Sequence, residues 1–369
     1  MSKKSQAILL VHGMGKHSAP SGGNPGSFKQ EFIDATTESL QSYSKYKTVT
    51  LAAHVDIHEF NYDQWFDTVR TRMADRAKEM QQRVEDISQV LGVSFAGDLV
   101  AMLTNLEAEF GDDELMYTHW LDVVFYTTIL GGKVRVDAAK KVAELVAEYG
   151  AGNVHVIAHC LGTAVIHDTL HLLYRAEHDP IDEIPDLDLV NHRLGSIWML
   201  GNVSRMVNSV VQLFDPLRSV VKPGDKGCAN YFINIRHKLD PFTWLAQFDP
   251  KNNGSWVDAG IYATDYRNYE NRLVVDANTH AFKPYVREPQ VSESLLYQMI
   301  DEFEVDVEEL DRVKMAYEAT AINGAYVKLE SAFNDLSHKD KATWKDFFHA
   351  AKTMQSAIKD IQAEQQVGG

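Results

Sequence analysis

The sequence predicts an α/β protein in which a mostly parallel sheet is flanked by helices. Short apolar runs end in glycine-rich or polar turns, and longer stretches with helical spacing separate these runs. Most of the runs lack polar alternation, which is typical of strands buried on both faces of a parallel sheet. With 369 residues, 45% of them hydrophobic, the chain is long enough for one large domain, which we expect to span residues 1–303.

The first expected strand covers residues 7–11 and leads into the loop His12-Gly13-Met14-Gly15. Glycines after a buried strand let the backbone approach another group closely. Such a loop can supply one of the two amide donors that stabilise the oxyanion in acyl transfer, here the N–H of Met14. Phosphate binding is the weaker alternative, because a Gly-Lys-Ser/Thr ending and the dinucleotide-binding glycine spacing are both missing.

A second strand is expected within residues 48–60, where apolar and polar residues alternate. Residues 63–90 then have a helix-forming composition, and residues 91–106 are more apolar. We interpret residues 61–130 as a helical insertion that caps a cleft and could line an acyl pocket. Packing of the same apolar side chains into a core is the more common use of such a pattern.

Cys160 lies at the apex of a predicted strand-to-helix turn. Residues 154–158 form the next expected strand, and a nucleophile elbow after it requires small residues two positions before and two positions after the nucleophile. Ala158 and Gly162 meet this requirement. The alternative is a small, buried cysteine without a chemical role.

Apolar residues at helical spacing predict a helix over residues 161–174. Its N-terminus would direct amide hydrogens and the positive end of the helix dipole at Cys160, which favours the thiolate. The N–H of Leu161 is the second candidate oxyanion donor. His159, directly before the thiol, belongs to the same predicted elbow.

The predicted acid and base follow later strands. Residues 231–235 form a β-prone run, and Asp240 follows it, held in an extended or turn conformation by the proline after it. Residues 273–275 are the last expected strand, and His280 follows in a loop. In this arrangement Asp240 orients His280, which removes the proton from Cys160 and later delivers one to the leaving group.

Three other residues compete for these roles. His237 is an alternative base, and Asp215 and Asp276 are alternative acids. His280 and Asp240 are favoured because they follow the expected strands in the order nucleophile, acid, histidine.

The last helix of the domain is expected to start near residue 291 and to reach residue 303. Residues 304–369 have a helical composition throughout and predict a C-terminal helical extension, with a break within residues 334–341. Packing of this extension against its own domain is the default expectation. Formation of a homo-oligomer and docking of a partner through these helices are the alternatives.

These motifs resemble those of the α/β-hydrolase superfamily, in the lipase-like branch that includes GPI-inositol-deacylase-like serine esterases. The resemblance extends over roughly residues 5–302, with a poor match between residues 60 and 130. It implies an α/β-hydrolase fold and hydrolysis of carboxylic esters, often lipidic ones, without cofactor or metal. The family has serine where this chain has Cys160. The resemblance rests on residues 11–15 and 157–164, on Asp240-Pro241, and on His280 with Tyr285 and Pro289 after it.

Cysteine at this position allows three interpretations. An active thiol would form a thioester that water or another acceptor resolves; the retained Asp240, His280 and oxyanion loop favour this interpretation. The others are a protein that kept the fold but lost efficient turnover, and a cysteine substituted for a serine. The leading hypothesis is therefore a hydrolase or acyltransferase acting on a small ester, thioester or lactone. A non-catalytic interaction protein and a cysteine peptidase or amidase are the competing hypotheses.

Composition argues against several other classes. The net charge of −16 disfavours binding to nucleic acid and to anionic membrane surfaces. No run approaches the ~18 apolar residues that span a bilayer, and the apolar run at residues 7–11 is too short for a signal-peptide core. Two cysteines, Cys160 and Cys228, suit a reducing compartment. We therefore expect a cytoplasmic protein without stable membrane insertion, cofactor or metal.

Overall fold

The computed structural model describes residues 4–13, 27–66, 68–69, 122–123, 125–177, 183–211, 215–243, 246–251, 256–276, 278–322, 330 and 356. The described residues belong to two compact units. The larger one, here called the sheet unit, contains residues up to 13, from 27 to 60 and from 135 onward. The second unit contains the described residues between 61 and 134.

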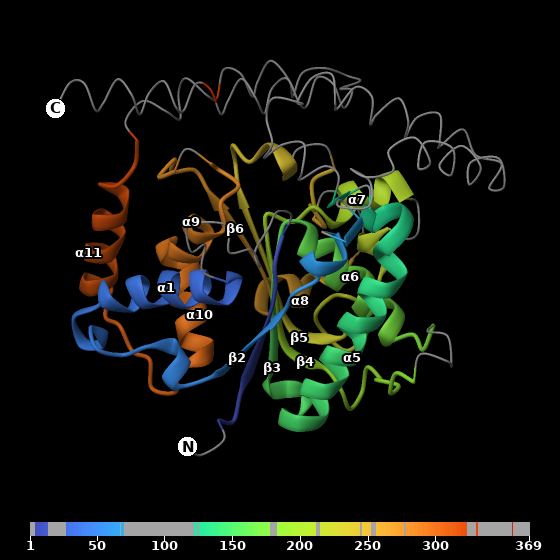
Figure 1. The fold of residues 1–369 in the computed structure, drawn as a ribbon. Coiled ribbons are helices and arrows are strands. Elements are labelled where there is room, and N and C mark those ends of the chain that lie inside the picture. The colour runs from blue at the N-terminus through green and yellow to red at the C-terminus, as the bar shows by residue number, and fades with distance from the viewer. Residues whose placement is uncertain are drawn as a thin grey trace. The chain divides into compact units, whose positions relative to one another are not determined.

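Six parallel strands form the centre of the sheet unit (Figure 1), in the order β2-β1-β3-β4-β5-β6. Val11 on β1 lies opposite both Phe60 on β2 and Ala158 on β3. The α/β class and the parallel sheet predicted from the sequence are therefore confirmed. The strands are β1 (Ala7–Val11), β2 (Asp56–Phe60), β3 (Val154–His159), β4 (Leu194–Leu200), β5 (Ala229–His237) and β6 (Tyr266–Asn271).

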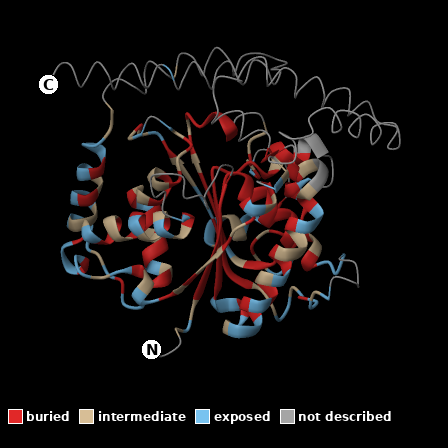
Figure 2. Ribbon diagram, viewed as in Figure 1, coloured by how far each residue is buried: buried red, intermediate tan, exposed pale blue. Residues whose placement is uncertain are grey.

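Helices cover both faces of the sheet (Figure 1), so the inner strands are buried (Figure 2). β1, β3 and β4 are buried along their whole length, which explains their apolar sequences. The helices on one face are α1 (Phe28–Gln41), α9 (Phe282–Arg287), α10 (Pro289–Met299) and α11 (Val307–Glu318). Those on the other face are α5 (Gly131–Tyr149), α6 (Leu161–Leu173) and α7 (Ser204–Val211), and the short helix α8 covers Ala259–Thr264.

Two strand predictions were wrong in position. Within residues 48–60 only Asp56–Phe60 is a strand, and Leu51–Ala53 forms a 3₁₀ turn. The last strand is Tyr266–Asn271 rather than residues 273–275, which lie in a loop. This strand is at the edge of the sheet and has the polar sequence YRNYEN, so no apolar run marks it. β4, which contains Gly195 and a serine, was not predicted at all.

The helices after His280 also differ from the prediction. A short helix, α9, follows His280, and the next helix begins at Pro289 and ends at Met299 rather than covering residues 291–303. Proline suits the first turn of a helix because its missing N–H has no acceptor there. The backbone N–H of Val291 is capped by the Glu288 side chain.

The first part of the predicted C-terminal extension forms α11 and packs on the sheet unit. Val313 and Tyr317 are buried, and Arg312 hydrogen bonds to the carbonyl of Ser42. The predicted break at residues 334–341 lies outside the described residues, as does most of the predicted insertion. In the second unit, the ring of Phe66 contacts those of Tyr62 and Phe125, as expected where aromatic side chains pack into a core.

The described ranges contain neither a membrane-spanning helix nor a group of side chains that could bind a metal. None of the helices there combines the length and the apolar character needed to cross a bilayer. No group of three or more His, Cys, Asp or Glu side chains in the same ranges could hold a metal ion. Cys160 and Cys228 are both free thiols.

Candidate functional site

The strand order marks one end of the sheet as the place for a site. The chain adds β2 on one side of β1 and then β3 to β6 on the other side, so the order reverses between β1 and β3. In open parallel sheets, ligands bind outside the carboxyl ends of the strands at such a switch point. His12 and Gly13 follow β1 there, and Cys160 follows β3.

Cys160 lies in a strained turn between β3 and α6. Its backbone angles are φ 53° and ψ −126°, in a region that residues with a side chain rarely adopt and that costs about 1–3 kcal/mol. The surrounding backbone holds this conformation, because the Cys160 N–H donates to the carbonyl of Leu200 at 3.0 Å. The Cys160 carbonyl in turn accepts from the backbone N–H of Thr163 at 2.9 Å.

Two glycines let the loop after β1 approach this turn. A Cβ on Gly162 would lie 2.4 Å from the carbonyl oxygen of His12 and 2.5 Å from that of Val11. A Cβ on Gly13 would lie 2.6 Å from the Cβ of Cys160. The glycines noted in the sequence are thus required by a close contact between the β1 loop and the elbow.

The structure describes only one of the two candidate oxyanion donors. Leu161 begins α6, so its N–H has no acceptor within the helix and lies next to the thiol in the chain. Met14 and Gly15 fall outside the described residues. The buried ring of His12 donates through Nδ1 to the carbonyl of Gly13 at 2.7 Å.

Asp240 and His280 come from the loops after β5 and β6 and form a buried pair. The Nδ1 of His280 donates to the Oδ2 of Asp240 at 2.6 Å. The exposed fraction is 0% for Asp240 and 5% for His280. A carboxylate removed from water in this way needs protein donors in place of the lost hydration.

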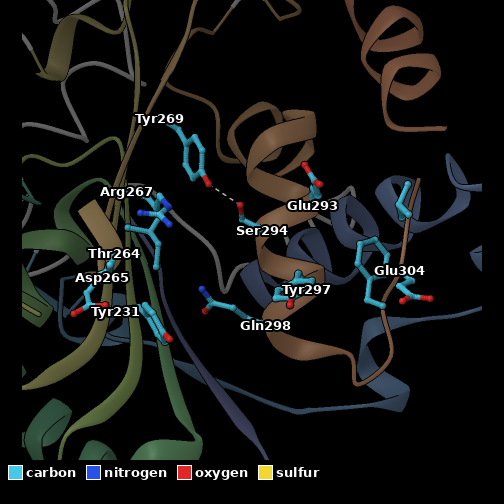
Figure 3. Close-up of a pocket in the computed structure, with 13 residues that line it drawn as sticks. Tyr231, Thr264, Asp265, Arg267, Tyr269, Glu293, Ser294, Tyr297, Gln298 and Glu304 are labelled. Carbon is cyan, nitrogen blue, oxygen red and sulfur yellow. Dashed lines mark hydrogen bonds between the residues drawn. The ribbon is translucent and has the colours of Figure 1, made fainter. Parts of the chain in front are cut away.

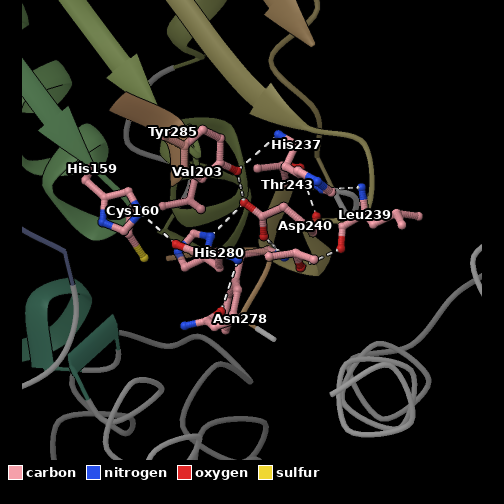
Figure 4. A network of polar contacts seen from close by, with 12 residues as sticks. His159, Cys160, Val203, His237, Leu239, Asp240, Thr243, Asn278, His280 and Tyr285 are labelled. Carbon is pink, nitrogen blue, oxygen red and sulfur yellow. Dashed lines mark hydrogen bonds and ion pairs between the residues drawn. The ribbon is translucent and has the colours of Figure 1, made fainter. Parts of the chain in front are cut away.

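Two further protein groups donate hydrogen bonds to the Asp240 carboxylate (Figure 4). The backbone N–H of Phe242 donates to Oδ1 of Asp240 at 3.0 Å, and the hydroxyl of Tyr285 on α9 donates to Oδ2 at 2.6 Å. Burial and the charge of Asp240 raise the pKa of Tyr285 well above its ordinary value, so its hydroxyl stays protonated as a donor. In the sequence, Tyr285 contributes only to the family resemblance, and no pattern there marks this contact.

His280 is arranged to accept a proton. Burial lowers its pKa, but the negative charges of Asp240 and Cys160 outweigh this effect, and the pKa is raised above its ordinary value. The buried Nε2 of His280 bonds to no nitrogen or oxygen in the part of the chain that the structure describes, and the Cys160 side chain, besides that of Asp240, interacts with the imidazole. An imidazole oriented through Nδ1, with Nε2 available beside a thiol, can exchange a proton with the sulfur.

His159 and Gly201 shape the position of this imidazole. The Nε2 of His159 donates to the backbone carbonyl of His280 at 2.9 Å, and the two ring centroids lie 4.9 Å apart. Gly201 follows β4 with φ 55°, and a Cβ there would lie 3.0 Å from Cε1 of His280 and 3.3 Å from Oδ2 of Asp240. His159 was among the predicted residues, whereas nothing in the sequence pattern singled out Gly201.

The rival residues have other contacts. His237 accepts from the Leu239 N–H at Nδ1 and donates from Nε2 to the Leu273 carbonyl, and burial lowers its pKa. The side chain of Asp215 caps the 3₁₀ turn that follows it. Asp276 is exposed and accepts from the N–H of Asn278. The structure therefore brings Asp240, and none of these rivals, to His280.

A separate cavity of about 520 Å³ lies between β5, β6 and α10 (Figure 3). Its wall combines tyrosines with charged side chains, among them Tyr231, Tyr297, Arg267 and Glu293. None of the predicted site residues lines it.

Comparison with protein-family models, with curated proteins and with solved structures found no match. The resemblance to α/β-hydrolases therefore stays a prediction. The support for a function comes from the geometry of the described residues.

Proposed function

We propose that the protein is an α/β-hydrolase that cleaves or transfers acyl groups through a covalent intermediate on Cys160. The substrates would be carboxylic esters, thioesters or lactones. The observation that carries the proposal is the buried Asp240–His280 pair beside a cysteine held in a strained strand-to-helix turn.

The position of these residues along the chain supports the proposed fold and chemistry. The nucleophile elbow follows β3, the acid follows β5, and the histidine follows β6. This is the order nucleophile, acid, histidine expected of α/β-hydrolases. The carboxyl ends of all three strands lie at the same end of the sheet, because all strand pairs in it are parallel.

In the proposed first half-reaction, Nε2 of His280 holds the proton taken from the Cys160 thiol, and the resulting thiolate attacks the acyl carbonyl carbon. The N–H of Leu161 and, by the sequence prediction, that of Met14 stabilise the resulting oxyanion. Collapse of the tetrahedral intermediate breaks the carbonyl bond to the leaving oxygen or sulfur. The imidazolium returns its proton to this leaving group, and a thioester remains on Cys160.

In the second half-reaction, water attacks the thioester carbonyl while His280 takes one of the water protons. The carbon–sulfur bond then breaks, the carboxylic acid leaves, and the proton returns to the sulfur. A hydroxyl, amine or thiol acceptor in place of water would make the same enzyme an acyltransferase. Because the reaction needs a free thiol, a reducing compartment such as the cytoplasm suits it.

The test is intact-mass detection of acyl adducts after brief exposure to short and medium-chain p-nitrophenyl esters. We expect one acyl adduct and release of nitrophenol from the parent protein, and neither from Cys160→Ala. Cys228→Ala is the matched control, because Cys228 is the other free, buried thiol, and it should acylate like the parent.

Two further variants make the test decisive. Cys160→Ser should form an oxygen ester if the site is of the serine-esterase type, and His280→Ala should slow acylation. If neither the parent nor the serine variant acylates with any of the esters, the proposal is wrong and a non-catalytic interaction protein becomes the better hypothesis.

A further inference from the structure

One oxygen of Asp240 accepts two hydrogen bonds that come from the same short segment. Nδ1 of His280 and the hydroxyl of Tyr285 both donate to Oδ2, each at 2.6 Å. The two residues are five positions apart, one at the end of the loop after β6 and the other in α9. The segment that supplies the histidine therefore also holds the acid that faces it (Figure 4).

The hydroxyl of Tyr285 does more than fill space. The ring belongs to the hydrophobic core cluster and is 1% exposed, a role that phenylalanine could fill equally well. The oxygen, however, donates to Asp240 and also accepts from the backbone N–H of His237 at 3.1 Å. It thereby joins the acid to the last residue of β5.

We propose that Tyr285 is a positioning residue for the Asp240–His280 pair, an inference that rests on the proposed function. Its hydroxyl fixes the rotation of the carboxylate, so that Oδ2 stays aimed at Nδ1 of His280. It also takes up part of the charge on Oδ2, which limits how strongly Asp240 holds the imidazolium. The histidine can then return its proton to the leaving group.

The other described polar groups around the pair make contacts that differ from this one. Phe242 donates to the opposite oxygen, Oδ1, through its backbone. His159 donates to the carbonyl of His280, and both ring nitrogens of His237 bond to backbone groups. Among the residues that the structure describes, the other titratable group acting on His280 is Cys160, whose charge acts on the ring directly.

The test is Tyr285→Phe, with the low-field ¹H NMR signal of the His280 Nδ1–H as the readout. Without the competing donor, the Nδ1–H to Oδ2 bond strengthens, so we expect the signal to move downfield. The midpoint of the His280 titration should rise by about one pH unit. In ester turnover, kcat should fall roughly tenfold while KM stays within about twofold. An unchanged signal and midpoint would overturn the proposal.

Two controls separate positioning from general damage. Tyr46→Phe removes another buried hydroxyl, which bonds to the backbone at Glu302 and Glu304, and should leave the signal unchanged. 3-Fluorotyrosine at position 285 keeps the hydroxyl but makes it a stronger donor, so the signal should move upfield. This second variant also keeps the proposal testable if the phenylalanine variant does not fold.

The NMR readout does not depend on turnover. If no ester acylates Cys160 but the signal moves as expected, the proposed reaction is wrong and the positioning role stands. If esters acylate Cys160 and the signal does not move, the positioning role is wrong and the proposed reaction stands.

Discussion

Two clusters in the described part of the chain have a similar composition, but they differ in the properties that the proposed reaction requires. In the first, Asp240 and His280 lie beside Cys160. In the second, Nδ1 of His167 lies 3.1 Å from Oδ1 of Asp168 and its Nε2 lies 2.9 Å from Oγ of Ser219. All three members of the second cluster are buried, with exposed fractions of 1–2%.

The clusters differ in how their polar atoms are satisfied. Oγ of Ser219 contacts His167, donates to the carbonyl of Pro216 and accepts from the N–H of Val221, so it is fully engaged. In the first cluster, Nε2 of His280 bonds to no nitrogen or oxygen among the residues described and interacts with Cys160, which has a strained backbone. Complete hydrogen bonding is typical of a structural network, whereas a histidine nitrogen beside a strained cysteine suits the proposed reaction.

The largest expected difference between the clusters is in the rate of acylation. His280→Gln should slow the release of nitrophenol from p-nitrophenyl esters by roughly 10²–10⁴-fold, because the proposed general base is lost. His167→Gln should leave the rate per folded molecule unchanged but lower the free energy of unfolding by about 1–3 kcal/mol. Stopped-flow absorbance and urea unfolding measure the two effects. Equal rates for the two variants would contradict the distinction between the clusters.

A smaller effect is expected from filling the space beside the Asp240–His280 pair. Gly201→Ala places a methyl group 3.0 Å from Cε1 of His280 at a positive φ, so the ring must shift. We expect a roughly tenfold loss of kcat and a destabilisation of about 1–2 kcal/mol. Gly260→Ala is the matched control, because a Cβ there meets nothing within 4 Å. Wild-type kinetics in Gly201→Ala would mean that the tight fit has no role in positioning His280.

The smallest effect is on the pH dependence of stability. The pKa of His280 is raised in the folded state, so its contribution to stability is complete below its unfolded pKa of about 6.5 and is lost as the pH rises through the folded value. Asp240→Asn removes the main cause of this shift. The stability deficit of this variant relative to wild type should therefore be greater at pH 6 than at pH 9.

Urea unfolding at the two pH values measures this deficit. Asp276→Asn, which changes an exposed aspartate, is the control and should show no such trend. A deficit of Asp240→Asn that stays constant or grows toward pH 9 would contradict the assigned charge interaction.

Local sequence determined much of the fold and the central part of the candidate site. The apolar runs at β1 and β3 could be found because strands buried on both faces must be apolar. β5, whose Tyr231 is exposed, was found from its β-prone composition. The elbow at Cys160 could be found because a tight turn demands small neighbours, here Ala158 and Gly162. The roles of Asp240 and His280 were predicted from the order of nucleophile, acid and histidine along the strands, although neither residue lies in a distinctive sequence motif.

Tertiary structure alone decided which strands pair and which distant side chains contact each other. β6 was misplaced because an edge strand can be polar, and its identity depends on pairing with β5. The contacts that Tyr285 and Gly201 make with the Asp240–His280 pair have no local signature, because each joins segments about 40 residues or more apart. Spacing along a chain predicts which residues share a strand or a helix face, but only packing decides which loops meet at the end of the sheet.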